Sequence, residues 1–154
     1  MIELADTLSP EVRALVDELD RELYAIYPEA IANGIVPPDL AKFVPPSGRF
    51  AVARDRGTLV GCGALLVLPD RLVEVKRMFV RPEARGKGIS RRILTFLEDE
   101  GRRCGAERIR LETGSRQPAA IGLYRSSGYT DIAPWPPFET DPLSVCLGKP
   151  LLAR

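Results

Sequence analysis

The sequence predicts a mixed α/β (α+β) fold, in which three antiparallel strands precede an alternation of helices and strands. The first observation is the expected order of elements along the 154 residues, α-β-β-β-α-β-α-β-β. The second is a change of hydrophobic period after Arg81-Pro82, from the alternation typical of strands to the spacing typical of helices. The third is a strand–helix–strand succession over residues 72–113, which implies a right-handed crossover and a parallel strand pair.

The first half of the chain predicts one helix and three strands. Ser9-Pro10-Glu11 has the residue types of a helix start, and Pro28 is expected to end that helix. Four prolines within residues 37–46 predict a loop that holds one short helical turn around residues 39–43. The expected strands of an antiparallel meander are 50–54, 59–68 and 72–80.

The second half alternates between the two element types. Apolar residues at helical spacing run from Ile89 to Leu97, and the glycines at 101 and 105 mark the end of this helix. The remaining expected elements are a strand over 107–113, a helix over 117–127, a strand from Tyr129, a proline-rich loop and a closing strand over 143–147. No repeat or linker divides them, so we expect a single domain over residues 1–154.

Composition narrows the class of protein further. The chain is 45% hydrophobic and 28% charged, as expected of a globular protein with its own core. No apolar run approaches the roughly 20 residues of a membrane span, and residues 1–6 do not resemble a secretory signal. We therefore expect a cytoplasmic protein that has no membrane partner.

Two residue types limit the chemistry. Histidine is absent, which excludes Ser-His-Asp triads, Cys-His dyads and most catalytic zinc sites. The three cysteines, Cys62, Cys104 and Cys146, are scattered without metal-ligand spacing. We expect buried, unreactive thiols and no metal, so proton transfer has to use carboxylates, tyrosines, lysines or water.

Charge is unevenly distributed although the net charge is only +1. Residues 1–30 hold eight acids and two bases, whereas residues 71–92 hold eight bases and two acids. One interpretation is that the first segment attracts a cationic ligand and the second an anionic one. The other is that the two segments are solvated faces that partly neutralise each other.

A glycine-rich turn lies between an expected strand and an expected helix, at residues 81–92. Glycines at such a position allow backbone N–H groups to approach an anion, and the helix N-terminus adds partial positive charge. The spacing of glycines in this turn matches neither the phosphate-binding loop of nucleoside triphosphatases nor the dinucleotide-binding fingerprint. Once these two motifs are excluded, the pattern that remains in this turn is Arg85-x-x-Gly88-x-Ser90.

This turn resembles the acyl-CoA loop of the GNAT N-acetyltransferase superfamily, [Q/R]-x-x-G-x-[G/A], with Ser90 in place of the last small residue. The strand over residues 73–80 is similar to the strand that precedes this loop in the family. The stretch from Gln117 to Tyr129 is similar to the family's N-x-x-A-x-x-L-Y-x-x-x-G-[F/Y]. The resemblance implies a GNAT-like fold, a central mixed sheet of about six to seven strands flanked by about four helices.

The resemblance also implies the activity, an acetyl-CoA-dependent N-acetyltransferase (an acyltransferase) that uses direct attack by a primary amine in a ternary complex. The acceptor would be an amine-bearing small molecule or a protein amino group, and a homodimer is compatible with the sequence. The main-chain N–H of Met78 is expected to stabilise the oxyanion. The residues expected to bind the cofactor are Met78, Phe79, Val80, Arg85, Gly86, Lys87, Gly88, Ile89, Ser90, Arg91 and Gln117.

Two residues are expected to transfer protons. Glu74 matches the strand position of a general-base glutamate in some family members, and strict alternation would place it on the same face as Met78. A salt bridge is the alternative role for Glu74, and Glu112 is the second candidate base. Tyr124 occupies the family's general-acid position, with a core tyrosine as the alternative.

Two other classes of function stay open. A non-catalytic acyl-CoA-binding regulatory module would keep residues 85–90 without needing Glu74 or Tyr124. A nucleic-acid binder is suggested by the basic segment, but the chain lacks the overall basicity and aromatic platform of such proteins, so we expect no nucleic-acid partner. The proline-rich loops and the first helix are expected to shape the acceptor site, whose ligand the sequence leaves open.

Overall fold

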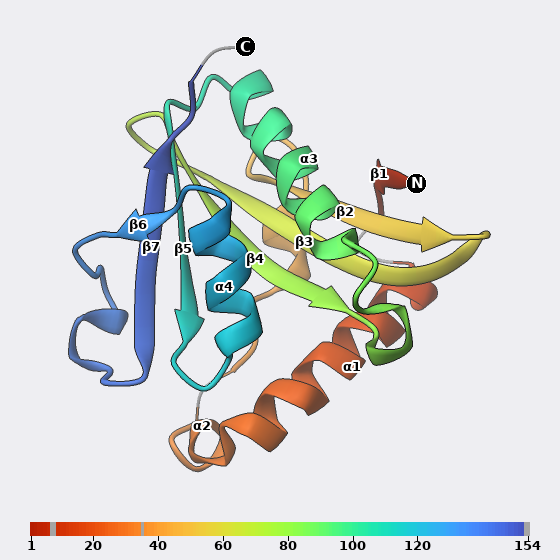
Figure 1. The fold of residues 1–154 in the computed structure, drawn as a ribbon, viewed down its shortest axis with the longest axis horizontal. Helices are drawn as coiled ribbons and strands as arrows, with labels where there is room; N and C mark the ends of the chain where they lie inside the picture. Colours follow the sequence, from red (N-terminus) through yellow and green to blue (C-terminus); the bar gives the residue numbers. More distant parts are fainter. Residues whose placement is uncertain (7–8, 35, 153–154) are drawn as a thin grey trace.

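A seven-stranded mixed sheet forms the centre of the computed structural model, which describes residues 1–6, 9–34 and 36–152. Its strand order is β1-β2-β3-β4-β5-β7-β6 (Figure 1). Only β4 and β5 are paired in parallel, and all other described neighbours are antiparallel. The strands are β1 (Ile2–Leu4), β2 (Gly48–Asp55), β3 (Thr58–Leu68), β4 (Leu72–Val80), β5 (Arg108–Gly114), β6 (Thr130–Asp131) and β7 (Ser144–Pro150).

Helices cover both faces of this sheet. One core joins α3, α4 and the sheet, and a second core joins α1 to the other face of β2, β3 and β4. The helices are α1 (Pro10–Ile26), α2 (Pro28–Ala32), α3 (Ile89–Arg103) and α4 (Pro118–Ser126), with 3₁₀ turns η1 (Leu40–Phe43), η2 (Pro82–Ala84) and η3 (Phe138–Thr140). The predicted fold class, with its six to seven strands and four helices, is confirmed.

The N-terminal region differs from prediction at two places. The Ser9 hydroxyl accepts a bond from the Val12 N–H at 3.4 Å, as expected of a helix cap. α1 ends at Ile26, just before Pro28, as predicted, but Pro28 then begins the short helix α2, which was not predicted, because a proline at the first helical position loses no hydrogen bond. The three-residue edge strand β1 was not predicted, since it is too short to show a hydrophobic period.

A β-bulge in β4 determines which side chains face which side of the sheet. The β3–β4 register shifts between Cys62 and Ala64, so that Gly63 lies opposite two residues, and Arg77 takes a left-handed φ of 57°. As a result Met78 packs into the α3 core, while Glu74 lies on the other face, beside Arg110. The prediction that Glu74 and Met78 share a face is therefore wrong.

The strands β4 and β5 separate halfway along their length. Their pairing runs from Leu72 and Arg108 to Val75 and Leu111 and ends there, although β4 continues to Val80. β5 stays paired with β7 as far as Gly114. The two parallel strands therefore diverge, and the residues after Val75 and Leu111 border an opening in the sheet.

Gly63 leaves room for the Met78 side chain at the bulge, so we expect a larger residue at position 63 to destabilise the protein. A Cβ added at Gly63 would lie 2.6 Å from Met78 Sδ and 2.8 Å from Ile93 Cγ2, whereas nothing lies within 4 Å of a Cβ added at Gly122 in α4. Gly63→Ala should therefore lower the free energy of unfolding by about 1–3 kcal/mol through overpacking. Gly122→Ala should raise it by about 0.5–1 kcal/mol through helix propensity. Urea unfolding of both variants tests this, and a Gly63→Ala protein as stable as Gly122→Ala would contradict it.

Candidate active site

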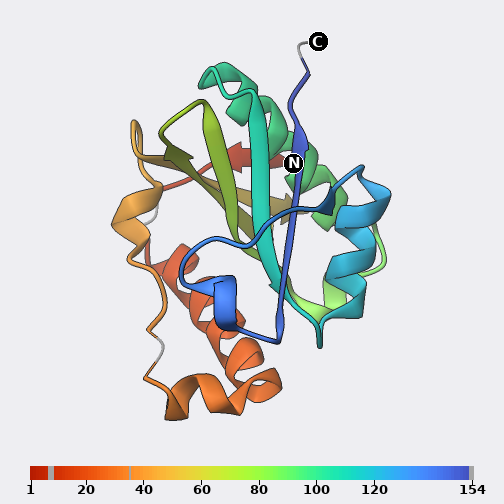
Figure 2. The same ribbon diagram turned by 90° about the vertical axis from the view of Figure 1, so that its left-hand side faces the viewer.

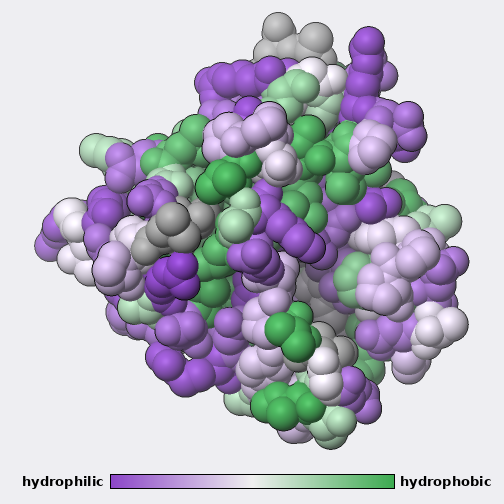
Figure 3. Space-filling model, turned by 180° about the vertical axis from the view of Figure 1, so that it is seen from behind, coloured by the Kyte–Doolittle hydropathy of each residue, from purple (hydrophilic) through white to green (hydrophobic). Residues whose placement is uncertain are grey.

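A cavity of about 970 Å³ occupies the opening between β4 and β5. Its lining extends from the glycine-rich loop at Gly86, Gly88 and Ser90, past Met78, to the C-terminal half of α1, α2 and the segment after η3. The surface seen from behind is hollowed near its centre, with hydrophilic and hydrophobic side chains around the recess (Figure 3). The cavity thus joins the two regions expected to hold the acyl donor and the acceptor.

At Gly86 and Gly88 the glycine-rich loop lines the cavity without a side chain that could cover its backbone groups. Gly86 and Gly88 have φ of 80° and 77°, and a Cβ at either would meet nothing within 4 Å. Gly88 is the N-cap of α3 and provides no side-chain cap, so the first N–H groups of the helix remain available to an anion. The region therefore fits a phosphate group bound by main-chain N–H donors.

The basic side chains around the loop have other partners. The Arg91 guanidinium donates to the hydroxyls of Ser126 and Ser127 at 2.8 and 3.0 Å, and Lys87 Nζ lies 3.4 Å from an Asp55 carboxylate oxygen. Neither Lys87 nor Arg91 is among the described residues that line the cavity. Arg85 does line it.

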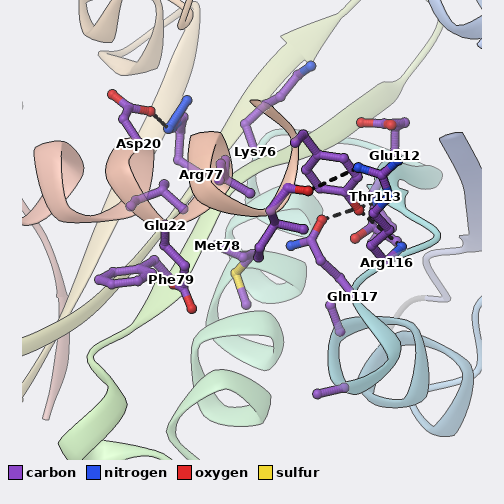
Figure 4. A pocket seen from close by; sticks show the side chains of 18 of the residues that line it. Asp20, Glu22, Lys76, Arg77, Met78, Phe79, Glu112, Thr113, Arg116 and Gln117 are labelled. Carbon is purple, nitrogen blue, oxygen red and sulfur yellow. Dashed lines mark hydrogen bonds and ion pairs between the residues drawn. The ribbon is translucent and has the colours of Figure 1, made fainter. Parts of the chain in front are cut away.

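Ion pairs fasten α1 to the strand and turn that carry the site. Arg77 pairs with Asp20, Arg81 pairs with Glu18 through two 2.9 Å contacts, and Arg85 pairs with Glu22 at 2.8 Å. In Figure 4 Arg77 points toward Asp20, on one side of Met78. The acidic and basic segments of the sequence therefore neutralise each other directly, as the second interpretation of the charge pattern proposed.

Glu112 lies on the opposite side of the opening, next to Thr113, Arg116 and Gln117 (Figure 4). Glu112 lines the cavity, and its carboxylate accepts a 2.7 Å hydrogen bond from the Ser144 hydroxyl. Burial raises the pKa of this carboxyl above its usual range, against the opposing effects of that hydrogen bond and of Lys76. Glu112 is thus a carboxyl group in the cavity with a pKa moved toward neutrality.

Glu74 is placed differently. Its side chain is 5% exposed, and its two oxygens contact Lys76 Nζ at 2.8 Å and Arg110 Nε at 2.9 Å. Among the described residues that line the cavity, Lys76 is present and Glu74 is not. Glu74 therefore forms the salt bridge that was the alternative to its role as a base.

The two tyrosines at and after the end of α4 have separate surroundings. Tyr124 is 6% exposed and lines the cavity, and burial together with the Glu112 charge raises the pKa of its phenol. Tyr129 is buried and donates a 2.7 Å hydrogen bond to Glu98, which also pairs with Lys149 at 2.8 Å. Tyr124 is thus a protonated phenol at the cavity, whereas Tyr129 belongs to a buried network.

The far end of the cavity includes residues that the sequence did not single out. The Tyr27 hydroxyl accepts the Arg116 N–H at 3.1 Å, and the Arg116 guanidinium pairs with Glu29 at 2.6 Å. Asp141 lines the same end. These residues come from the junction of α1 and α2, from α2 itself and from two loops. The sequence indicated that the first helix and the proline-rich loops would shape the acceptor site, but no common motif indicated which side chains meet there.

The described residues contain no group of three His, Cys, Asp or Glu side chains placed to hold a metal ion. A membrane-spanning helix is likewise not found in the part of the chain that the structure covers, since none is both long and apolar enough.

The fold and this site together define an N-acetyltransferase. The model of the acetyltransferase (GNAT) family matches residues 12–129, and the chain belongs to this family. Over 145 residues the chain is 46% identical to the IAA acetyltransferase of Azospirillum brasilense, covering 94% of this chain and 93% of that protein.

Solved structures agree on the fold. A Klebsiella pneumoniae protein of the acyl-CoA N-acyltransferase type superposes with a TM-score of 0.81 at 31% identity, covering 99% of this chain and 97% of that one. A Salmonella typhimurium protein solved with its cofactor acetyl-CoA has a TM-score of 0.68 at 22% identity, covering 100% and 95%.

Proposed function

We propose that this N-acetyltransferase transfers an acetyl group from acetyl-CoA to a primary amine by direct attack, with both substrates bound in one complex. The observation that carries the proposal is a single cavity that joins the open N-terminus of α3 to the half-buried carboxyl group of Glu112, with Met78 in its lining. A complex that holds both reactants in this geometry converts a bimolecular reaction into a unimolecular one.

The donor half of the cavity fits an acyl-CoA thioester. Main-chain N–H groups of residues 86–90 would bind its pyrophosphate, and the free edge of β4 at Met78, Phe79 and Val80 would bind its pantetheine arm as an added strand. Ile89 and Gln117 line the same space. The Met78 N–H would then donate to the carbonyl oxygen as negative charge develops there.

The charged side chains that line the cavity favour an amine as the acceptor. Each cationic side chain that lines the cavity in the described residues is already in an ion pair, as Lys76–Glu74, Arg77–Asp20, Arg85–Glu22 and Arg116–Glu29. Two lining carboxylates, Glu112 and Asp141, form no ion pair with any residue that the structure describes. A cationic ammonium group therefore gains more from this surface than an anionic acceptor does.

Proton transfer would involve two side chains. Glu112 takes a proton from the ammonium group so that the neutral amine attacks the acetyl carbonyl carbon, and Tyr124 gives its phenolic proton to the departing thiolate. The raised pKa of Tyr124 keeps the phenol protonated at neutral pH. A cysteine intermediate has little support, because Cys62 is fully buried and burial raises the pKa of its thiol to about 12.

The acceptor is a small amine or an exposed protein amino group, bound by one domain formed from residues 1–154. A non-catalytic acyl-CoA-binding module would have no use for the Glu112 carboxyl group and the Tyr124 phenol at the same cavity. A panel of primary amines, each assayed for release of free CoA thiol from acetyl-CoA, tests the activity. Release of thiol without acetylation of any amine would contradict the proposal.

Acetyl-CoA should raise the Tm of the wild-type protein in a saturable way. Gly88→Asp should abolish this rise, because it places a negatively charged side chain at the α3 N-terminus, where the pyrophosphate would bind. Gly105→Asp is the matched control, since Gly105 also has a positive φ, of 81°, with open space around it, but lies outside the cavity lining. A wild-type protein that shows no rise would contradict the donor site.

Glu112→Gln should lower kcat/KM by about 10²–10⁴ at neutral pH, the usual contribution of a general base. The base must be deprotonated, so wild-type kcat/KM should rise with pH through the raised pKa of Glu112. The variant should lose this rise and recover part of its activity at high pH, where free amine is abundant. If Glu74→Gln loses the rise and Glu112→Gln keeps it, Glu74 is the base.

Tyr124→Phe should lower kcat by about 10²–10⁴ where thiolate departure limits turnover, because the positioned proton donor is removed. The ring and its contact with Tyr129, at 6.0 Å between centroids, are kept, so the Tm should change little. An acetyl thioester with a more acidic thiol should lose less activity. A variant with wild-type kcat under limiting chemistry would make Tyr124 a core residue only.

A further inference from the structure

Glu74 lies at the centre of a charged cluster behind the cavity wall. The Lys76 ammonium and the Arg110 guanidinium contact different oxygens of its carboxylate, at 2.8 and 2.9 Å. A buried carboxylate keeps its charge only when such partners compensate for lost hydration. In turn the carboxylate fixes where both cations point.

Each of these cations also contacts an aromatic ring from another part of the chain. Lys76 Nζ lies 5.5 Å from the centre of the Phe138 ring, and Arg110 Cζ lies 4.0 Å from that of Trp135. The two rings pack edge to face, 5.8 Å apart. These distances are within the range of attractive cation–π contacts.

Both rings belong to the connection between β6 and β7, residues 132–143, called here the β6–β7 segment. It crosses in front of β4 and β5 (Figure 2). Its residues Phe138, Asp141, Pro142 and Leu143 line the cavity. Because the segment has only the short turn η3, its position depends on contacts such as these two cation–π pairs.

We propose that Glu74 is a positioning residue, which orients Lys76 and Arg110 so that they hold the β6–β7 segment in place as the wall of the acceptor end of the cavity. The inference rests on the proposed function for the identity of that end. Glu74 acts through the two cations and not on the substrate, so its loss should weaken amine binding more than it slows chemistry. The donor loop is at the other end and should be unaffected.

The tryptophan of the segment provides a direct test, since Trp135 is the only tryptophan in the chain. Glu74→Gln should increase the quenching of its fluorescence by acrylamide, because the released segment exposes the ring to water. Glu98→Gln is the matched control, as Glu98 is another buried glutamate paired with a lysine at 2.8 Å, away from this segment. It should leave the quenching unchanged. Equal quenching in wild type and Glu74→Gln, or an equal rise in both variants, would overturn the proposal.

Kinetics separate positioning from a catalytic role. With phenethylamine, agmatine and spermidine as acceptor probes, Glu74→Gln should raise the amine KM about tenfold, the size of a lost cation–π contact. KM for acetyl-CoA and the pH profile should stay as in wild type, and Glu74→Asp should restore part of the affinity. A lower kcat with unchanged amine KM would overturn the proposal.

A second variant covers the case in which Glu74→Gln does not fold. Phe138→Leu removes the ring that Lys76 contacts but keeps an apolar side chain, so it should raise the amine KM on its own. The double variant should be no worse than the more affected single one, because both changes remove the same support. Additive effects would mean that the two residues act independently. If no probe is acetylated the proposed function fails, whereas the quenching result still decides whether Glu74 holds the segment.

Discussion

The site depends on one constraint, the end of the β4–β5 pairing at Val75 and Leu111. Beyond this point β5 remains in the sheet through β7, whereas β4 bulges at Arg77 and turns away. Backbone N–H and C=O groups that leave a sheet need new partners. The divergence of β4 from β5 therefore has two consequences. It opens a cavity, and it leaves a row of β4 backbone groups available to a ligand.

Ion pairs hold the walls of this opening and determine which charges remain available. The Arg77–Asp20 pair is the most buried of those that join α1 to β4, with side chains 7% and 20% exposed. Breaking a buried pair leaves an uncompensated charge, so this contact matters more than the exposed Arg85–Glu22 pair. Because the cations of the cavity lining are engaged in this way, Glu112 and Asp141 give an acidic character to the end of the cavity proposed to bind the acceptor.

The order of elements could be predicted from the sequence because hydrophobic period, caps and prolines act locally. The glycine-rich loop could be predicted for the same reason, since its spacing lies within one short segment. The opposite orientation of Glu74 and Met78 could not be predicted, because the bulge at Arg77 interrupts the alternation between them and no residue pattern marks it. The first helix and the proline-rich loops were expected to shape the end of the cavity proposed for the acceptor, but which of their side chains meet there depends on contacts that form only in the folded chain.

In the proposed complex, acetyl-CoA occupies the opening between β4 and β5 and pairs with the free edge of β4. Amide hydrogen exchange of the wild-type protein, measured with and without CoA, tests it most directly, because backbone N–H groups are the expected ligands. We expect added protection at Met78–Val80 and at residues 86–90, with little change in β2 and β3. Protection elsewhere, with exchange at these two segments unchanged by saturating CoA, would contradict it.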